Sequence, residues 1–74
     1  MKHITPTGHR VRDWIAEQWA ANAYGPTVRE VQRHFGWKSP AGAAYHLHRL
    51  REAGHVTWND GEPRSIKTTK GNAT

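Results

Sequence analysis

The chain has no cysteine and few apolar residues, and each absence excludes classes of protein. Without cysteine there are no disulfide bonds, thiolate metal ligands or cysteine nucleophiles. Hydrophobic residues make up 35% of the chain, and the mean hydropathy is −0.92. No apolar run reaches the roughly 18 residues of a membrane span or resembles the core of a secretory signal. We therefore expect a soluble cytoplasmic protein without membrane association. Its 74 residues suffice for one domain and exclude most enzymes.

Large aliphatic side chains are also scarce, with two Leu, three Ile and four Val beside a single Phe. Together with a net charge of +5, this composition lies in the range where intrinsically disordered chains are found. Four tryptophans oppose that interpretation, because each can bury on the order of 150–250 Å². We expect a folded chain with an aromatic core drawn from Trp14, Trp19, Trp37 and Trp58. Trp19 is the weakest core candidate and, if exposed, would be an interface residue.

Acidic residues are few in comparison with basic ones. Six Asp and Glu stand against eleven Lys and Arg, the isoelectric point is near 10.3, and six histidines add positive charge at low pH. This balance favours a polyanionic partner, most often a nucleic acid.

Two helices are predicted in the first half of the chain. Thr5 and Pro6 form a start signal, and the helix predicted over residues 6–22 has apolar residues at helical spacing. Those residues are Val11, Trp14, Ile15, Trp19 and Ala20. After the Gly25-Pro26 break, Thr27 and Glu30 form a capping box for a helix of about eight residues. The inner face of that helix is predicted to be Val28, Val31 and Phe35, and Gly36 is suited to a left-handed end.

A third helix and a hairpin complete the predicted fold. Ser39 and Pro40 start a helix that runs to about residue 53, ends at Gly54 and buries three residues, Ala43, Leu47 and Leu50. The tight connection between the second and third helices is typical of a helix-turn-helix. From His55 the apolar period changes to two, with Val56 and Trp58 on one face, a turn over residues 59–63, and a returning strand over 64–69 with Ile66 facing inward.

Three helices followed by a two-stranded β-hairpin wing describe an α+β winged helix-turn-helix over residues 1–69, with a flexible tail at 70–74. In this fold the third helix enters the major groove of DNA, and the hairpin lies along the backbone or in the adjacent minor groove.

A series of short motifs runs through these predicted elements. The motifs are Pro26-Thr27, Glu30-Val31, Phe35-Gly36-Trp37, Ser39-Pro40, Ala43, His46-Leu47, Leu50, Gly54-His55-Val56 and Arg64-Ser65-Ile66-Lys67. In residue type and spacing, over about residues 3–69, the chain resembles the DNA-binding domain of the LexA repressor family. The resemblance implies a winged-helix module that binds operator DNA.

Two departures limit what the resemblance implies. LexA repressors carry a C-terminal self-cleaving peptidase domain, which uses a Ser/Lys pair and dimerises the repressor. The 74 residues contain no such domain, so self-cleavage is not expected of this chain. In the family the early third helix follows the pattern Ser-Pro-Asn-Ala-Ala-Glu-Glu-His-Leu, whereas residues 39–47 here are Ser-Pro-Ala-Gly-Ala-Ala-Tyr-His-Leu. Because the Asn and both Glu are missing, the family's preferred operator is not expected.

Base contacts are expected on the outward face of the third helix. The predicted residues are Ala41, Gly42, Ala44, Tyr45 and His48. Small side chains let the helix backbone approach base edges, but an Ala methyl discriminates weakly in comparison with the ~1–3 kcal/mol of a good bidentate pair. Tyr45 and His48 are therefore the main candidates for specific contacts. The alternative for Tyr45 is a partly buried surface aromatic.

Phosphate contacts are expected around that helix and on the hairpin. The candidates are Thr27, Arg29, Lys38, Ser39, Asn59, Arg64 and Lys67. Free amides at the start of the third helix favour an anion beside Ser39. For each cation the alternative is a solvated surface charge. Asp60 and Glu62 at the hairpin tip would repel phosphate, so the tip is expected to stay clear of DNA.

Other chemistry finds little support in the sequence. No two histidines are spaced four residues apart, and His46 and His48 diverge on a helix, so no metal site is expected. His46 is expected at the edge of the core and His34 on the surface. No phosphate-binding loop, nucleophile motif or carboxylate pair is present. We therefore expect neither enzymatic activity nor a cofactor.

The leading functional prediction is a sequence-selective module for double-stranded DNA, within a LexA-like transcriptional repressor associated with the nucleoid. One such unit buries a small interface, so weak monomeric binding is expected, strengthened by a second protomer on paired half-sites or by a partner domain. One alternative is an excisionase-like architectural factor of a phage or plasmid, which bends DNA. The other is a winged-helix protein-interaction module. The charge balance favours DNA.

Overall fold

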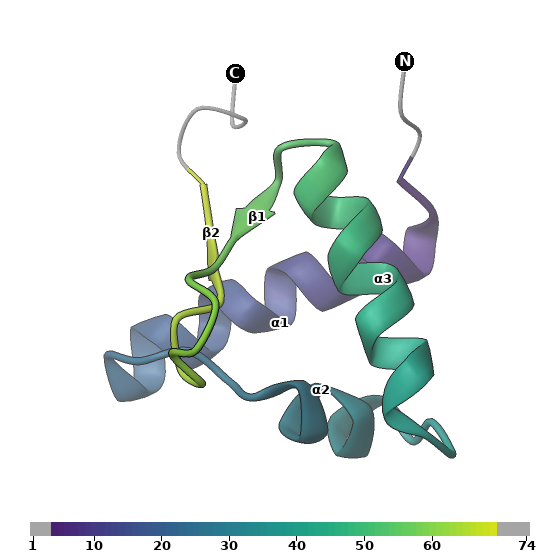
Figure 1. The fold of residues 1–74 in the computed structure, drawn as a ribbon, viewed down its shortest axis with the longest axis horizontal. Helices are drawn as coiled ribbons and strands as arrows, with labels where there is room; N and C mark the ends of the chain where they lie inside the picture. Colours follow the sequence, from purple (N-terminus) through teal and green to yellow (C-terminus); the bar gives the residue numbers. More distant parts are fainter. Residues whose placement is uncertain (1–3, 70–74) are drawn as a thin grey trace.

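The computed structural model describes residues 4–69, in which three helices precede a small hairpin (Figure 1). The elements are α1 Pro6–Asn22, α2 Val28–Phe35, α3 Pro40–Glu52, β1 Val56–Thr57 and β2 Lys67–Thr68. α3 crosses in front of α1, α2 lies below them in the view, and the hairpin stands beside α3. We call residues 55–69 the wing. The predicted α+β winged helix-turn-helix is confirmed. The predicted tail at 70–74 lies outside the described residues.

Helix starts follow the predicted capping residues. The Thr5 hydroxyl accepts a hydrogen bond from the Gly8 amide at 3.0 Å. Thr27 and Glu30 form the reciprocal box, with side chain to amide distances of 3.1 and 3.0 Å. Ser39 occupies the N-cap position of α3, but its side chain makes no capping hydrogen bond. The local start signals therefore set the helix boundaries, and the Ser39 hydroxyl remains available to other groups.

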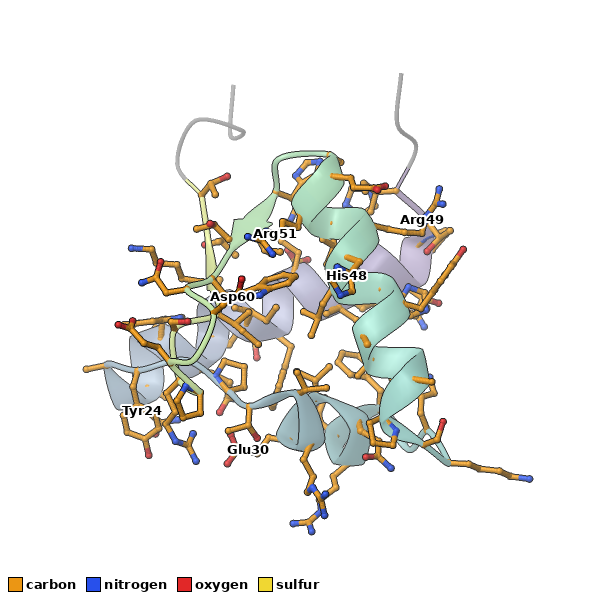
Figure 2. All side chains as sticks on the ribbon, in the orientation of Figure 1. Tyr24, Glu30, His48, Arg49, Arg51 and Asp60 are labelled. Carbon is orange, nitrogen blue, oxygen red and sulfur yellow. The ribbon has the colours of Figure 1, made fainter. Side chains whose placement is uncertain are left out.

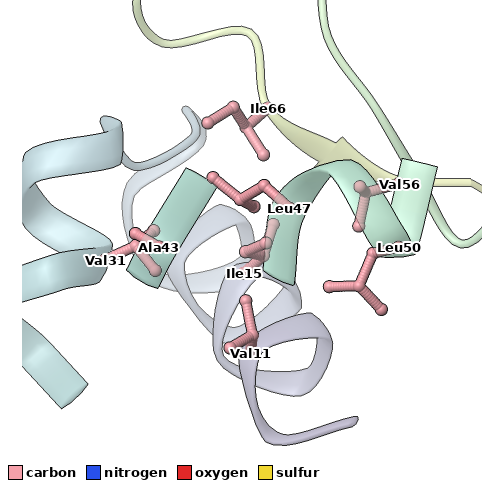
Figure 3. Close-up of a cluster of buried hydrophobic side chains, with 8 residues drawn as sticks. All are labelled: Val11, Ile15, Val31, Ala43, Leu47, Leu50, Val56 and Ile66. Atoms are coloured by element: carbon pink, nitrogen blue, oxygen red, sulfur yellow. The ribbon is translucent and has the colours of Figure 1, made fainter. Parts of the chain in front are cut away.

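The core is aliphatic, so the prediction of an aromatic core is wrong (Figure 3). The buried hydrophobic residues are Val11, Ile15, Val31, Ala43, Leu47, Leu50, Val56 and Ile66. All four tryptophans are only partly buried and pack around this cluster. Compact side chains fill the space where the helices cross, and the larger indoles cover its rim. Trp19 belongs to this rim, because its indole N–H donates to the Ile66 carbonyl at 2.6 Å.

Two apolar residues of the predicted helical patterns, Ala20 and Val28, are exposed. Ala20 lies about 180° around α1 from Val11, because nine residues at ~100° each carry it to the opposite side. Val28 is 37% exposed because it lies at the first turn of α2, on the rim of a surface groove. Val31, one turn further along α2, is fully buried.

The wing has shorter strands than predicted. β1 and β2 are antiparallel, with Val56 opposite Thr68 and Thr57 opposite Lys67. The long loop between them is closed by a side chain, since the Asn59 amide donates to the Ser65 hydroxyl at 2.8 Å. Local hydrogen bonds of this kind replace the strand ladder that the alternating pattern predicted.

No helix within residues 4–69 is long and apolar enough to cross a membrane.

Candidate nucleic-acid interface

α3 presents an open strip of small side chains on the side that faces the wing. Ala41 and His48 are exposed, and Ala44 between them is half-buried. Helical spacing places the three within about 60° of one another around the axis. His48 projects from α3 on the same face of the molecule as Arg51 and Asp60, whereas Arg49 lies on the opposite flank (Figure 2). Three of the five predicted base-contacting residues therefore share one accessible strip.

A groove of about 640 Å³ separates this strip from the wing. We call it the α3–wing groove. Its walls include Ala44, His48 and Arg51 on α3, and Trp58, Asp60 and Glu62 on the wing. The charges are divided across it, with Arg51 on the α3 wall and two carboxylates on the wing wall. An anion in the groove is therefore attracted toward α3 and repelled from the wing tip.

Trp58 lies between two side chains of α3. The Arg51 guanidinium carbon is 4.3 Å from the centroid of the Trp58 ring, within the range of a cation–π contact. The His48 ring meets the same indole edge-on, with centroids 5.4 Å apart. The wing thus holds Arg51 and His48 in place from one side. Within residues 4–69, no carboxylate forms an ion pair with Arg51.

The other two predicted base-contacting residues lie away from the groove. Tyr45 is 56% exposed, and the Arg49 guanidinium lies 5.7 Å from its ring centroid. Gly42 faces the helix-turn-helix connection, where an added Cβ would lie 3.5 Å from three carbons of Trp37. Tyr45 therefore lies on the exposed surface of α3 outside the groove. Gly42 faces the protein and allows α3 to pack closely against the turn.

The turn itself is held by a stack of rings. Trp37 lies parallel to both Phe35 and His46, with centroids 5.1 Å apart in each pair. Burial lowers the pKa of His46, and the nearby Arg49 charge lowers it further. His34 is exposed and stacks on Trp14 with centroids 4.3 Å apart. The predicted places of His46 at the core edge and of His34 on the surface are confirmed.

Three predicted phosphate ligands are exposed, two of them just before α3 and one at the start of α2. Lys38 and Ser39 are exposed immediately before the first turn of α3, and Arg29 is exposed at the start of α2. No ion pair to Lys38 or Arg29 occurs in the described part of the chain. Thr27 is half-buried, with its hydroxyl oxygen occupied by the Glu30 amide. Lys38, Ser39 and the free amides of α3 therefore form a compact group of donors beside Ala41.

Arg64 points away from the α3–wing groove. Its guanidinium donates to both carboxylate oxygens of Glu30, at 2.9 Å each, and to the Gly25 carbonyl at 3.2 Å. It also lies 4.8 Å from the centroid of the Tyr24 ring. These hydrogen bonds from Arg64, followed by that from the Thr27 amide, lower the pKa of Glu30. In the structure Arg64 ties the wing to the start of α2.

The remaining wing candidates are Asn59 and Lys67. Lys67 lines a second groove of about 480 Å³ with Trp19, apart from the exposed strip of α3. Asn59 lines both this groove and the α3–wing groove, and its side-chain amide donates to the Glu62 carboxylate at 3.0 Å. Among residues 4–69, no group of His, Cys, Asp or Glu side chains is arranged to hold a metal ion.

Comparison with known proteins identifies the family. The sequence matches the family model of the LexA DNA binding domain over residues 1–65. The chain belongs to this family. It is 37% identical over 70 residues to the LexA repressor of Thermotoga neapolitana, covering 95% of this chain and 35% of the relative. It is 30% identical over 67 residues to the transcription regulator LexA of Synechocystis sp., covering 90% of this chain and 33% of the relative. The chain thus spans about a third of the length of these curated relatives.

As a LexA-type domain, the chain has one feature that sequence reasoning missed. Trp58 was predicted to lie in the core and Arg51 was not among the predicted contact residues, but the two side chains meet across the α3–wing groove. The spacing of His48 and Arg51, three residues apart on one helix, places both on the same side of α3. No local pattern predicts that the indole of Trp58 packs against them, because the wing must fold back first.

Proposed function

We propose that this LexA-type domain binds double-stranded DNA with sequence preference, as the DNA-binding part of a transcriptional repressor. The observation that carries the proposal is the exposed strip of Ala41, Ala44 and His48 on α3. Its small side chains suit the close approach of a helix to base edges in the major groove. Lys38 and Ser39 flank the helix start, where phosphates are favoured, and the net charge of +5 supports a polyanionic partner.

The family assignment rests on a non-catalytic, DNA-binding part of LexA. We therefore propose no enzymatic activity for these residues. We also propose that the protein acts in the cytoplasm, in association with the nucleoid. Base preference is proposed to come mainly from Tyr45 and His48. Arg29, Lys38 and Ser39 are proposed to position the domain on the backbone. Thr27, Asn59, Arg64 and Lys67 stay candidates for weaker phosphate contacts.

Binding by one copy is expected to be weak, because a single helix-turn-helix unit covers a small area of DNA. We propose that a second copy on a paired half-site, or a partner domain, provides the additional affinity. Titration of a duplex containing one half-site tests this point. A tight complex of one protein with one half-site would contradict it.

Selection from a random duplex library near physiological salt, followed by sequencing, tests the function itself. A recovered motif supports sequence preference, and its symmetry and spacing report whether one or two copies bind. Recovery without a motif, accompanied by DNA bending, would favour an architectural factor instead. No recovery would favour a protein-interaction module.

Two substitutions separate base contacts from backbone contacts. Tyr45→Ala is expected to relax the preference at particular base pairs of the selected site. Lys38→Ala is expected to lower affinity for all duplexes alike. The slope of log affinity against log salt should fall in magnitude by about 0.9, the value for one phosphate contact. The reverse pattern would mean that the DNA-contacting face of α3 is wrongly assigned.

A further inference from the structure

We infer that Arg51, held against the Trp58 ring, is the phosphate anchor on the wing side of α3. This inference rests on the proposed binding of DNA and adds to it a contact between α3 and the wing. The guanidinium lies 4.3 Å from the indole centroid, and no carboxylate within residues 4–69 neutralises it. Arg51 is therefore a charged group that is already oriented and that has no acidic partner among the residues that the structure describes.

The contact with Trp58 leaves the donors of Arg51 usable. A guanidinium is planar, and its N–H groups point outward from its edge, so an aromatic ring against its face does not cover them. The same contact restricts the long side chain before DNA arrives. Less conformational freedom is then lost on binding than for an unsupported cation.

Arg64, by contrast, is less suited to this role. Its donors are engaged by both oxygens of Glu30 and by the Gly25 carbonyl. A phosphate would have to compete with an ion pair that is already formed. The structure therefore assigns Arg64 to holding the wing in place and Arg51 to meeting the DNA backbone.

The charges of the α3–wing groove favour the same assignment. Asp60 and Glu62 lie on the wing wall, opposite Arg51. They repel a phosphate chain that approaches the wing tip, so the backbone is directed to the α3 wall. His48 lies on that wall one turn before Arg51 and meets the Trp58 indole edge-on. A backbone that follows this wall passes beside base-contacting residues of α3.

The test is the affinity of the full chain for the selected duplex, measured between 50 and 200 mM salt. Arg51→Gln keeps most of the side-chain length and removes the charge. We expect it to weaken binding by about tenfold at low salt. The slope of log affinity against log salt should fall in magnitude by about 0.9, the value for one phosphate. The matched control is Arg10→Gln, which removes one charge from an exposed side chain of α1, the helix that α3 crosses in front of in Figure 1. It should leave affinity within about twofold and the slope unchanged, because salt screens distant charges.

Trp58→Leu, made alone and together with Arg51→Gln, tests the role of the ring. Alone it should weaken binding two- to fivefold, the range expected when an exposed cation–π contact is lost. In the Arg51→Gln background it should have no further effect. An equal loss in both backgrounds would overturn the positioning role. Thermal melting checks folding, and Trp58→Phe, which keeps a ring beneath Arg51, should retain most of the affinity.

The outcomes distinguish the anchor from the proposed function. If the wild-type chain shows no salt-dependent binding to any duplex, the proposed function fails and the anchor fails with it. If the wild type binds and Lys38→Ala weakens it, but Arg51→Gln behaves like Arg10→Gln, only the anchor is refuted.

Discussion

A Cβ atom added at Gly25 would collide with the base of the wing. It would lie 2.2 Å from the Ile66 carbonyl oxygen and 3.1 Å from the Arg64 carbonyl oxygen, both of which are backbone atoms. The Trp19 indole nitrogen would be 3.0 Å away. Gly25→Ala therefore requires the wing to move by about 1 Å relative to the loop between α1 and α2, since carbon rarely approaches oxygen closer than ~3 Å.

The cost of this movement follows from the contacts at the site. Overpacking costs about 1–3 kcal/mol. The hydrogen bonds from the Gly25 amide to Arg64 and from the Trp19 indole to Ile66 each contribute about 1 kcal/mol. We expect Gly25→Ala to lower the free energy of unfolding by about 2–4 kcal/mol. That is a large part of the roughly 4–11 kcal/mol available to a chain of 74 residues.

Gly42→Ala is the matched control, because the same methyl group has room there. Its Cβ would meet three Trp37 carbons at 3.5 Å, an ordinary van der Waals distance. Gly42 lies inside α3, where Ala is about 0.5–1 kcal/mol more favourable than Gly. The same substitution is therefore expected to stabilise the protein at one position and to destabilise it at the other.

Thermal melting followed by circular dichroism measures both effects. At about 4–8 °C per kcal/mol for a domain of this size, Gly25→Ala should lower Tm by at least about 8 °C. Gly42→Ala should raise it by about 2–8 °C. A Gly25→Ala protein that melts within about 2 °C of the wild type would refute the close approach of the wing to this loop.

Three further substitutions have defined outcomes. Ala23 ends α1 at φ 63°, so Ala23→Gly should stabilise the protein by about 0.5–1 kcal/mol in melting experiments; a lower Tm would contradict the left-handed conformation. Because the folded-state pKa of His46 is lowered from 6.5, the unfolded chain binds its proton first as pH falls. Stability should therefore decrease as pH falls below about 7, and less steeply in His46→Phe, which keeps a ring against Trp37; identical pH profiles would remove His46 as the cause. Asp60→Asn should tighten duplex binding at low salt and lose this effect at high salt; weaker binding would place DNA on the other side of the wing.

The starts of α1 and α2 are predicted correctly because capping is local, whereas α3 begins at Pro40 as predicted without a capping hydrogen bond from Ser39. Thr5 caps an amide three residues ahead, and Thr27 and Glu30 cap each other over the same distance. These pairs are visible in the sequence without knowledge of the fold. The end of α2 at Gly36 is equally local, with φ 71° where glycine is favoured. The helix-turn-helix followed directly from these signals.

The candidate interface was predicted less completely than the helix starts. It combines one face of α3, which follows from helical spacing, with contacts between α3 and the wing, which are distant in sequence. Ala41, Ala44 and His48 were placed by helical periodicity, and the structure keeps them on one strip. Periodicity also suggested that Val28 is buried, which is wrong because Val28 lies on the rim of the α3–wing groove. The aromatic core was wrong for a related reason. Counting tryptophans measures the area available for burial, but only packing decides which side chains lie at the centre.

The sequence by itself determined the helices, the turn between α2 and α3, the basic charge and the resemblance to LexA. Each depends on residue type or on neighbours within about four positions. Only the tertiary structure decided which cations are engaged and which are open. Arg64 meets Glu30 across 34 residues of chain, and Trp58 meets Arg51 only because the wing folds back beside α3. Partners at such separations are selected by the packing of whole elements, which a local pattern does not specify.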